Sequence, residues 1–157
     1  MKNSFYKIGF MAAVIFASAC FTGISAQSVS GSIAGGTVTK GKAAKATVVL
    51  SLPSGLHANS NRPGSEYAIP TTVRASATGV KIGAVSYPRG HNRKFEFSEN
   101  TLNVYEGRPT FGFNVTVPPT FRGKTVRVNV TVKYQACTNE VCYPPKSKQV
   151  TLTAKVI

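Results

Sequence analysis

The residues best suited to chemistry are two cysteines that lie close together toward the C-terminal end of the chain. Cys137 and Cys142 stand in the stretch KYQACTNEVCYPPK, and the only other cysteine of the 157 residues is Cys20. A thiol pair this close can form a disulfide, contribute two ligands to a metal, or exchange electrons with the disulfide of another protein. The compartment of the protein and the elements that hold the pair bear on this choice.

The N-terminal residues predict export. Lys2 and Lys7 precede the apolar run IGFMAAVIFASACF, and the small residues TGISA follow it. This order is typical of a secretory signal peptide, so we expect residues 1–26 to be a leader that is cleaved after Ala26. A second export route stays open, because ASAC ending at Cys20 loosely resembles a lipoprotein box, which would make Cys20 a lipid anchor. No segment after the leader resembles a membrane span.

Export favours a disulfide between the two cysteines, structural or redox-active, over a metal site. Disulfides persist outside the cytoplasm, and two neighbouring cysteines favour pairing with each other. A zinc site would need further ligands, but the only histidines, His57 and His91, lie in distant segments. No metal and no cofactor is therefore expected. The residues alone do not decide between a structural disulfide and a redox pair.

The elements that must position the pair are strands. Val126, Val128, Val130 and Val132 alternate with polar residues in KTVRVNVTVKYQA, which is the pattern of a half-buried strand. Pro and Gly interrupt the chain about every ten residues, as in an antiparallel β-sandwich. We expect one all-β domain over residues 27–157, with strands at 46–52, 71–77, 80–88, 101–107, 110–118, 124–136 and 148–157. Residues 53–70 and 88–100 are expected to be long irregular segments.

The cysteines follow one alternating segment and precede another, which predicts a hairpin turn at TNEV with one cysteine on each side. Pro144 and Pro145 remove two backbone donors and stiffen the exit from this turn. Cys137 is nearer the strand, so we expect it to be more covered than Cys142. Among nearby charges, Lys133, Lys146 and Lys148 favour a thiolate and Glu140 opposes it.

The composition is strongly basic. The chain has 19 Lys and Arg against 5 acidic residues, none of them Asp, for a formal net charge of +14. Such a charge attracts acidic partners, an anionic membrane face or nucleic acid. The cations occur singly along alternating segments, however, as on a solvated sheet face. Export and the lack of a nucleic-acid-binding motif argue against nucleic acid.

YQACTNEVCYPP resembles the cysteine element of the N-terminal domain of DsbD, the bacterial thiol:disulfide interchange protein. GLHANS, IPTTV, GVKIGAVSYPRG and LNVYEG extend the resemblance over most of the chain after the leader. The resemblance implies an immunoglobulin-like β-sandwich that acts as a protein-disulfide reductase or redox carrier in the periplasm. Its partners would be periplasmic proteins of the thioredoxin fold. The alternative is a non-catalytic immunoglobulin-like interaction module with a structural Cys137–Cys142 disulfide.

The resemblance also implies roles for single residues. Cys142 would form the mixed disulfide with a partner, and Cys137 would be the resolving thiol. The segment HNRKFEFSEN (residues 91–100, here called the cap segment) matches the place of a loop that shields the cysteines with an aromatic ring, which would be Phe97 or Phe95. Ordinary core packing is the competing interpretation for either phenylalanine.

This sequence departs from the family pattern at three points. The best-known members have five residues between the cysteines, whereas this chain has four. Their cap loop is acidic, whereas this one contains Arg93 and Lys94, which puts the electrostatics of partner choice in doubt. DsbD also continues into a membrane domain and a thioredoxin-like domain, whereas this sequence stops at Ile157. We therefore expect a separate membrane electron donor.

Overall fold

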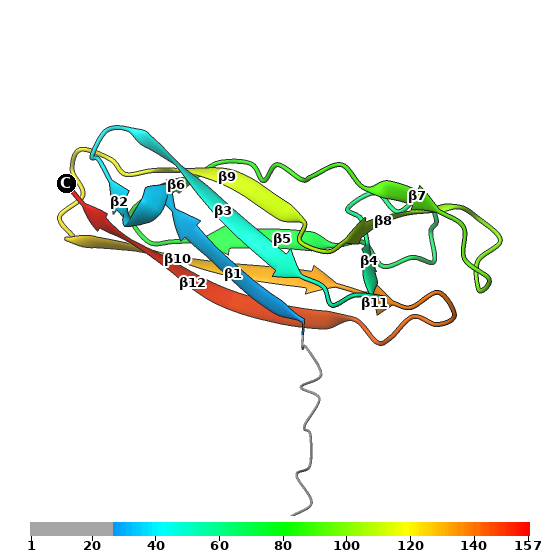
Figure 1. The fold of residues 1–157 in the computed structure, drawn as a ribbon. Helices are drawn as coiled ribbons and strands as arrows, with labels where there is room; N and C mark the ends of the chain where they lie inside the picture. Colours follow the sequence, from blue (N-terminus) through cyan, green and yellow to red (C-terminus); the bar gives the residue numbers. More distant parts are fainter. Residues whose placement is uncertain (1–26) are drawn as a thin grey trace, which may run out of the picture.

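The computed structural model describes residues 27–157, and the predicted leader with Cys20 lies outside the described residues. Almost all regular structure in this range is β, and the sole helical element is a short 3-10 turn, η1 (Ala34–Gly36). Figure 1 shows an elongated molecule in which two long sheets face each other. The strands are β1 (Ser28–Ile33), β2 (Thr37–Val38), β3 (Ala43–Ser51), β4 (His57–Asn59), β5 (Thr72–Ser76), β6 (Lys81–Ile82), β7 (His91–Arg93), β8 (Leu102–Glu106), β9 (Thr110–Thr116), β10 (Thr125–Tyr134), β11 (Ala136–Cys137) and β12 (Lys146–Val156).

The two long sheets form the sandwich. One has the order β1-β3-β9-β6 and the other the order β2-β12-β10-β5, with antiparallel pairing throughout except between β12 and β2. Alternation explains why these segments pack face to face, because every second side chain of β10 is buried, from Val126 to Tyr134. The buried residues of β3 and β9 cover this face from the opposite sheet. The predicted all-β, immunoglobulin-like sandwich is confirmed.

A third sheet was not predicted. It has the order β11-β4-β8-β7 and lies at one end of the sandwich (Figure 1). Two of its strands come from segments expected to be irregular, since β4 interrupts 53–70 and β7 interrupts 88–100. Both are only three residues long, so neither shows a measurable alternation in the sequence. We refer to this sheet as the site sheet.

The strand expected over residues 80–88 is largely wrong. Only β6 (Lys81–Ile82) pairs regularly with β9, and pairing resumes at a single bridge between Ser86 and Gly112. The amide of Gly83 still donates to the carbonyl of Asn114 at 2.8 Å. The chain therefore follows the sheet edge but bulges away from it between these contacts, which is a common way for an edge strand to end.

Candidate functional site

The cysteines form a disulfide across a tight turn at the end of the site sheet. Cys137 ends β11 and is bonded to Cys142, with an S–S distance of 2.03 Å and a Cα–Cα distance of 3.9 Å. The Thr138 amide donates to the Val141 carbonyl at 2.8 Å, and the Thr138 hydroxyl accepts from the amides of Glu140 and Val141 at 3.2 and 3.1 Å. The expected hairpin with a cysteine on each side is confirmed. The hydrogen bonds of the Thr138 amide and hydroxyl together fix this turn.

The two cysteines differ in exposure, as expected. Cys137 is fully buried because β11 pairs with β4, where Cys137 lies opposite His57. Cys142 is only half-buried. The chain after it is held by the Tyr143 amide, which donates to the Ala136 carbonyl at 2.8 Å, and by Gln135 Nε2, which donates to the Tyr143 carbonyl at 3.3 Å. One sulfur is thus covered by the sheet and the other is open to one side.

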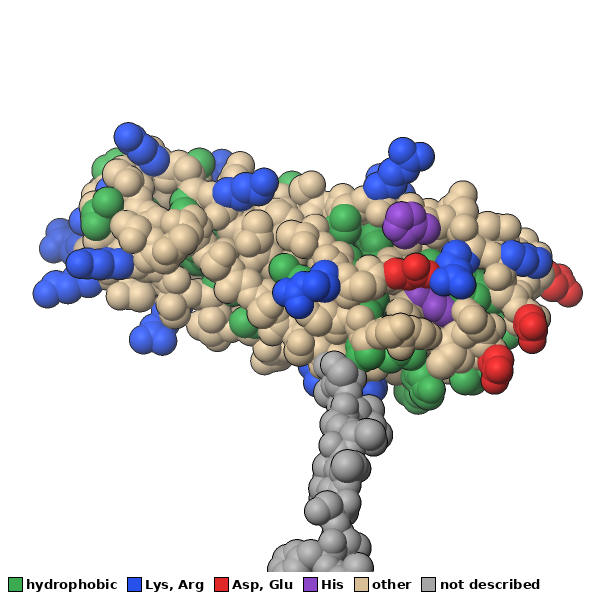
Figure 2. Space-filling model, viewed as in Figure 1, with side chains coloured by type: hydrophobic (Ala, Val, Ile, Leu, Met, Phe, Trp, Pro, Cys, Tyr) green, Lys and Arg blue, Asp and Glu red, His purple; other side chains and the backbone are tan. Residues whose placement is uncertain are grey.

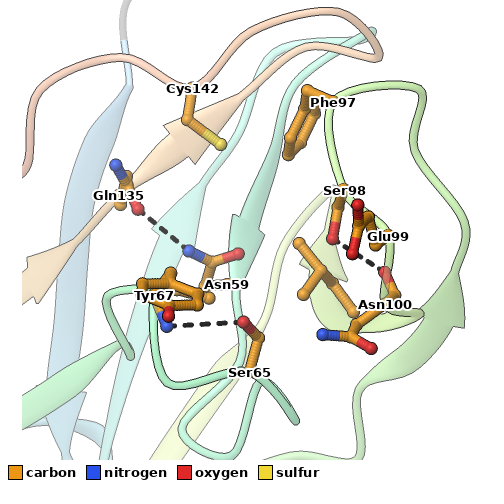
Figure 3. Close-up of a pocket in the computed structure, with 11 residues that line it drawn as sticks. Asn59, Ser65, Tyr67, Phe97, Ser98, Glu99, Asn100, Gln135 and Cys142 are labelled. Carbon is orange, nitrogen blue, oxygen red and sulfur yellow. Dashed lines mark hydrogen bonds between the residues drawn. The ribbon is translucent and has the colours of Figure 1, made fainter.

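Cys142 opens into a cavity of about 360 Å³ between the hairpin, the cap segment and the loop after β4. In Figure 3 the sulfur of Cys142 points toward this space, and the ring of Phe97 lies across it. Asn59 lies on the inner wall, where its Nδ2 donates to Gln135 Oε1 at 3.1 Å. Tyr67 lines the cavity from the loop that follows β4. This cavity gives a second molecule a route to one sulfur of the disulfide.

Three aromatic rings form a stack that supports the cap segment. His57 stacks on Phe95 with centroids 4.3 Å apart, and Phe95 stacks on Phe97 at 5.1 Å. Phe95 is 3% exposed and belongs to a small apolar cluster with Leu102 and Val104, whereas Phe97 is 39% exposed. The two candidate cap residues therefore have different surroundings. Phe95 anchors the segment, and Phe97 lines the cavity with Cys142.

His57 was considered in the sequence only as a metal ligand, and the structure places it at the base of the stack. Its ring is buried, and its Nε2 has no hydrogen-bond partner within the described residues. Burial lowers the pKa of His57, the nearby positive charge of Arg93 lowers it further, and Glu106 opposes the shift. The imidazole is therefore held in its neutral form. No sequence pattern identifies this residue, because β4 is only three residues long and Ala58 and Asn59 are buried as well.

Cations and acids surround the site in a partly paired arrangement. Arg93 forms an ion pair with Glu106 and lies 5.7 Å from the centroid of Phe95. Lys146 begins β12 behind the hairpin, and its Nζ donates to Gln27 Oε1 at 3.2 Å. Lys133 and Lys148 lie on the adjoining parts of β10 and β12. The basic residues of the cap segment thus contact neighbouring protein groups instead of projecting freely over the cysteines.

Exposed apolar side chains lie in the cavity and beside it. Val141 and Tyr143 flank Cys142 in the chain, Tyr67 and Phe97 line the cavity, and the Ile69 amide donates to Gln135 Oε1 at 3.4 Å. These five residues include all but one of the large apolar side chains that are exposed between residues 27 and 157. Clustered exposed apolar side chains mark interaction surfaces. We call these five residues the apolar rim.

Between residues 27 and 157 no cluster of three or more His, Cys, Asp or Glu side chains is placed to hold a metal ion. Within the described part of the chain, no helix has the length and apolar character needed to cross a bilayer.

Comparison with known proteins identifies the family. The family described as "Thiol:disulfide interchange protein DsbD, N-terminal" matches residues 31–154, which is most of the chain. Among solved structures, the reduced N-terminal domain of DsbD from Neisseria meningitidis is 18% identical with a TM-score of 0.47, over 70% of this chain and 77% of that one. The N-terminal periplasmic domain of ScsB from Proteus mirabilis is 14% identical with a TM-score of 0.44, over 81% of this chain and 44% of that one. No curated protein matches the sequence. From the family match, the chain belongs to the family of DsbD N-terminal domains.

Proposed function

We propose that this protein is an exported thiol–disulfide exchange domain that passes reducing equivalents to periplasmic partners of the thioredoxin fold. The observation that supports it most is the inequality of the two sulfurs. Cys142 opens into a cavity that Tyr67 and Phe97 of the apolar rim line, whereas Cys137 is buried in β11. Exchange proceeds by attack at one particular sulfur, so an accessible and a protected cysteine suit the two steps. Family membership fits the same chemistry.

The proposed reaction moves two electrons and two protons. In the reduced protein, the Cys142 thiolate attacks one sulfur of the partner's disulfide, so that a Cys142–partner mixed disulfide forms and the partner's second sulfur leaves as a thiolate that takes up a proton. The Cys137 thiolate then attacks Cys142 Sγ. This step restores the Cys137–Cys142 disulfide and releases the partner's first sulfur as a thiolate, which is protonated in turn. The partner ends as a dithiol, and the domain ends in the oxidised form described above.

The cap segment has a place in this proposal. Phe97 lies across the cavity from Cys142, so a partner that reaches the sulfur must displace this ring or bind beside it. Phe95 is buried against His57 and would hold the rest of the segment in place while Phe97 moves. We therefore assign the shielding role to Phe97 and the anchoring role to Phe95.

Location and supply of electrons belong to the same proposal. We propose that residues 1–26 are removed as a signal peptide and that residues 27–157 work in the periplasm as one domain. The ScsB domain in the comparison is described as periplasmic, which supports this location. Because the oxidised domain must be reduced again after each cycle, we propose a separate membrane electron donor that delivers two electrons through the same Cys142.

Single-cysteine variants test the proposal. Cys137→Ser keeps the accessible sulfur and lacks the resolving thiol, so it should accumulate a mixed disulfide with oxidised thioredoxin-fold proteins on a non-reducing gel. Cys142→Ser is the matched control, because it also lacks the disulfide but retains only the buried sulfur, and it should form far less adduct. Circular dichroism of both variants establishes that each is folded.

The same gel distinguishes the competing function. The apolar rim would equally suit an immunoglobulin-like interaction module whose disulfide is purely structural. In that case neither variant traps a partner, and the reduction potential of the wild-type disulfide lies below about −300 mV, as for other structural disulfides of exported proteins. Equal absence of adducts with a panel of thioredoxin-fold proteins would therefore refute the redox role.

A further inference from the structure

The acidic side chains are confined to one end of the long axis of the molecule. All five acidic side chains of the chain belong to the segments at the disulfide end: Glu66, Glu96, Glu99, Glu106 and Glu140. Figure 2 shows red side chains only at that end, whereas blue ones lie at both ends and have no red neighbours at the opposite end. The overall positive charge is therefore not spread evenly. It is concentrated away from the site.

The opposite end is built from three segments that hydrogen bonds join together. The Lys40 amide donates to the Ile157 carbonyl at 3.1 Å, the Gly41 amide to the Val117 carbonyl at 2.8 Å, and the Val156 amide to the Lys124 carbonyl at 2.9 Å. Six exposed cations project from this end, and we call them the basic end: Lys40, Lys42, Lys81, Arg122, Lys124 and Lys155.

None of the six side chains of the basic end makes a hydrogen bond or an ion pair with the described residues, in contrast to Arg93 and Lys146 near the site. The carboxylates lie at the other end of the sandwich, so within 27–157 no acidic side chain neutralises the basic end. β10 alone has ten residues. At a rise of roughly 3.3 Å per residue it separates the two ends by about 30 Å, which is several Debye lengths at physiological salt. The basic end thus acts as an electrostatic surface of its own.

We propose that the basic end binds the anionic headgroups of a membrane surface. The cations lie on the loop before β3, on the loop before β10 and on strands β6 and β12, all around one rounded end of the molecule, which suits a broad charged plane. Single-stranded nucleic acid is bound by exposed aromatic rings together with cations. The exposed aromatic rings of residues 27–157 (Tyr67, Phe97 and Tyr143) lie at the disulfide end instead. The exposed large apolar side chain at the basic end is that of Ile157, 63% exposed.

The proposed contact would orient the domain. With the basic end on the headgroups, the long axis stands away from the membrane, and the disulfide and the apolar rim lie about 30 Å above the surface, by the length of β10. Partners could then approach the cavity without competing with lipid. This inference does not use the redox role, so vesicle binding and partner trapping can fail independently.

Sedimentation with vesicles tests the proposal. The mature protein should bind phosphatidylcholine vesicles that contain phosphatidylglycerol, but not vesicles of phosphatidylcholine alone, and binding should weaken strongly between about 0.1 M and about 1 M salt. Each Lys or Arg near an anionic leaflet contributes roughly a five-fold gain in affinity. Removing four charges should therefore weaken binding by roughly 600-fold. The test variant combines Lys40→Gln, Lys42→Gln, Arg122→Gln and Lys124→Gln.

The matched control removes the same number of charges from exposed positions outside the basic end: Arg74→Gln, Arg89→Gln, Arg108→Gln and Lys133→Gln. It has the same net charge as the test variant, and it should retain most of the binding. Thermal unfolding of both variants establishes that they are folded. Equal weakening by the two variants would overturn the proposal, because binding would then follow net charge alone. No binding to anionic vesicles at low salt would overturn it as well, including the case in which nucleic acid or an acidic protein binds tightly instead.

Orientation gives a second readout that needs no charge change. A fluorophore attached at Thr120→Cys, in the loop between β9 and β10, should be quenched by a quencher carried on the lipid headgroups. The same fluorophore at Ser54→Cys, in the loop between β3 and β4 at the disulfide end, should not be quenched. Quenching of both positions to the same extent would refute a defined basic end as the contact.

Discussion

Replacing His57 with phenylalanine should make the folded protein more stable and remove one component of its pH dependence. The imidazole is buried and stacked 4.3 Å from Phe95, and its Nε2 has no partner within the described residues. A phenyl ring keeps the stack and eliminates the buried, unpaired nitrogen, which costs about 1–3 kcal/mol. Because phenylalanine is somewhat larger, some of this gain is offset by tighter packing. We expect the free energy of unfolding to rise by about 1 kcal/mol at pH 7.5.

The pH component follows from the lowered pKa of His57. Burial is the main cause, the charge of Arg93 adds to it, and Glu106 opposes it. Below the usual pKa of 6.5 the unfolded chain binds a proton at this residue that the folded protein does not bind. The contribution of neutral His57 to stability is therefore intact above pH 6.5 and is lost as the pH falls toward the folded pKa. The loss reaches at most about 1.4 kcal/mol per pH unit.

Urea unfolding of the oxidised protein at pH 7.5 and pH 5.5 measures both effects. The wild type should lose stability from this residue between the two values, and His57→Phe should lack that part of the loss. His91→Asn is the control, since His91 is exposed on β7, and it should lose stability with pH as the wild type does. An unchanged pH dependence in His57→Phe would refute the assignment of a buried neutral imidazole.

Four further changes give separate tests. Phe95→Ala should lower the free energy of unfolding by about 3–5 kcal/mol because its ring is buried, whereas Phe97→Ala should cost much less because its ring is 39% exposed; urea titrations measure both. Phe97→Ala should also let a small dithiol reduce the disulfide faster than in the wild type, and an equal rate would argue against a shielding ring. Reducing the disulfide should destabilise the protein by about 2 kcal/mol, the value for closing so short a loop, as measured by urea titration with and without reductant. Tyr105→Phe should lose about 1 kcal/mol, because its buried hydroxyl donates to Asn61 Oδ1 at 2.7 Å, and calorimetry should detect the lower melting temperature.

The long strands could be predicted from the sequence because their alternation is strong. β10 and β12 lie where the period-two pattern of apolar residues places them, and the burial of β10 follows it residue by residue. The site sheet could not be predicted, because β4 and β7 have three residues each and their pairing depends on distant partners. Residues 80–88 were predicted to be a strand for the same local reason as β10, namely alternating side chains. That segment lies at the edge of its sheet and has only β9 as a partner, so this one pairing decides where the strand ends.

The site was predictable in part. The spacing of the cysteines and the turn residues between them were sufficient to predict the hairpin and the greater burial of Cys137. Which phenylalanine faces the cavity could not be predicted, since Phe95 and Phe97 are two residues apart, and only the position of His57 beneath them distinguishes the two. Tyr67 and Gln135 reach the cavity through contacts far apart in sequence, which no local pattern records.

The small apolar cluster beneath the cap segment has a consequence for local unfolding. Phe95, Leu102 and Val104 form a cluster separate from the main core, with Ala68 packed against it. A few side chains hold this region, whereas the strands of the sandwich share a large common core, so the free energy of opening it is well below that of global unfolding. Amide protons of β7 should then exchange with solvent sooner than those of β10. The cap segment can open as a unit of its own while β11, whose Ala136 belongs to the main core, stays folded around Cys137.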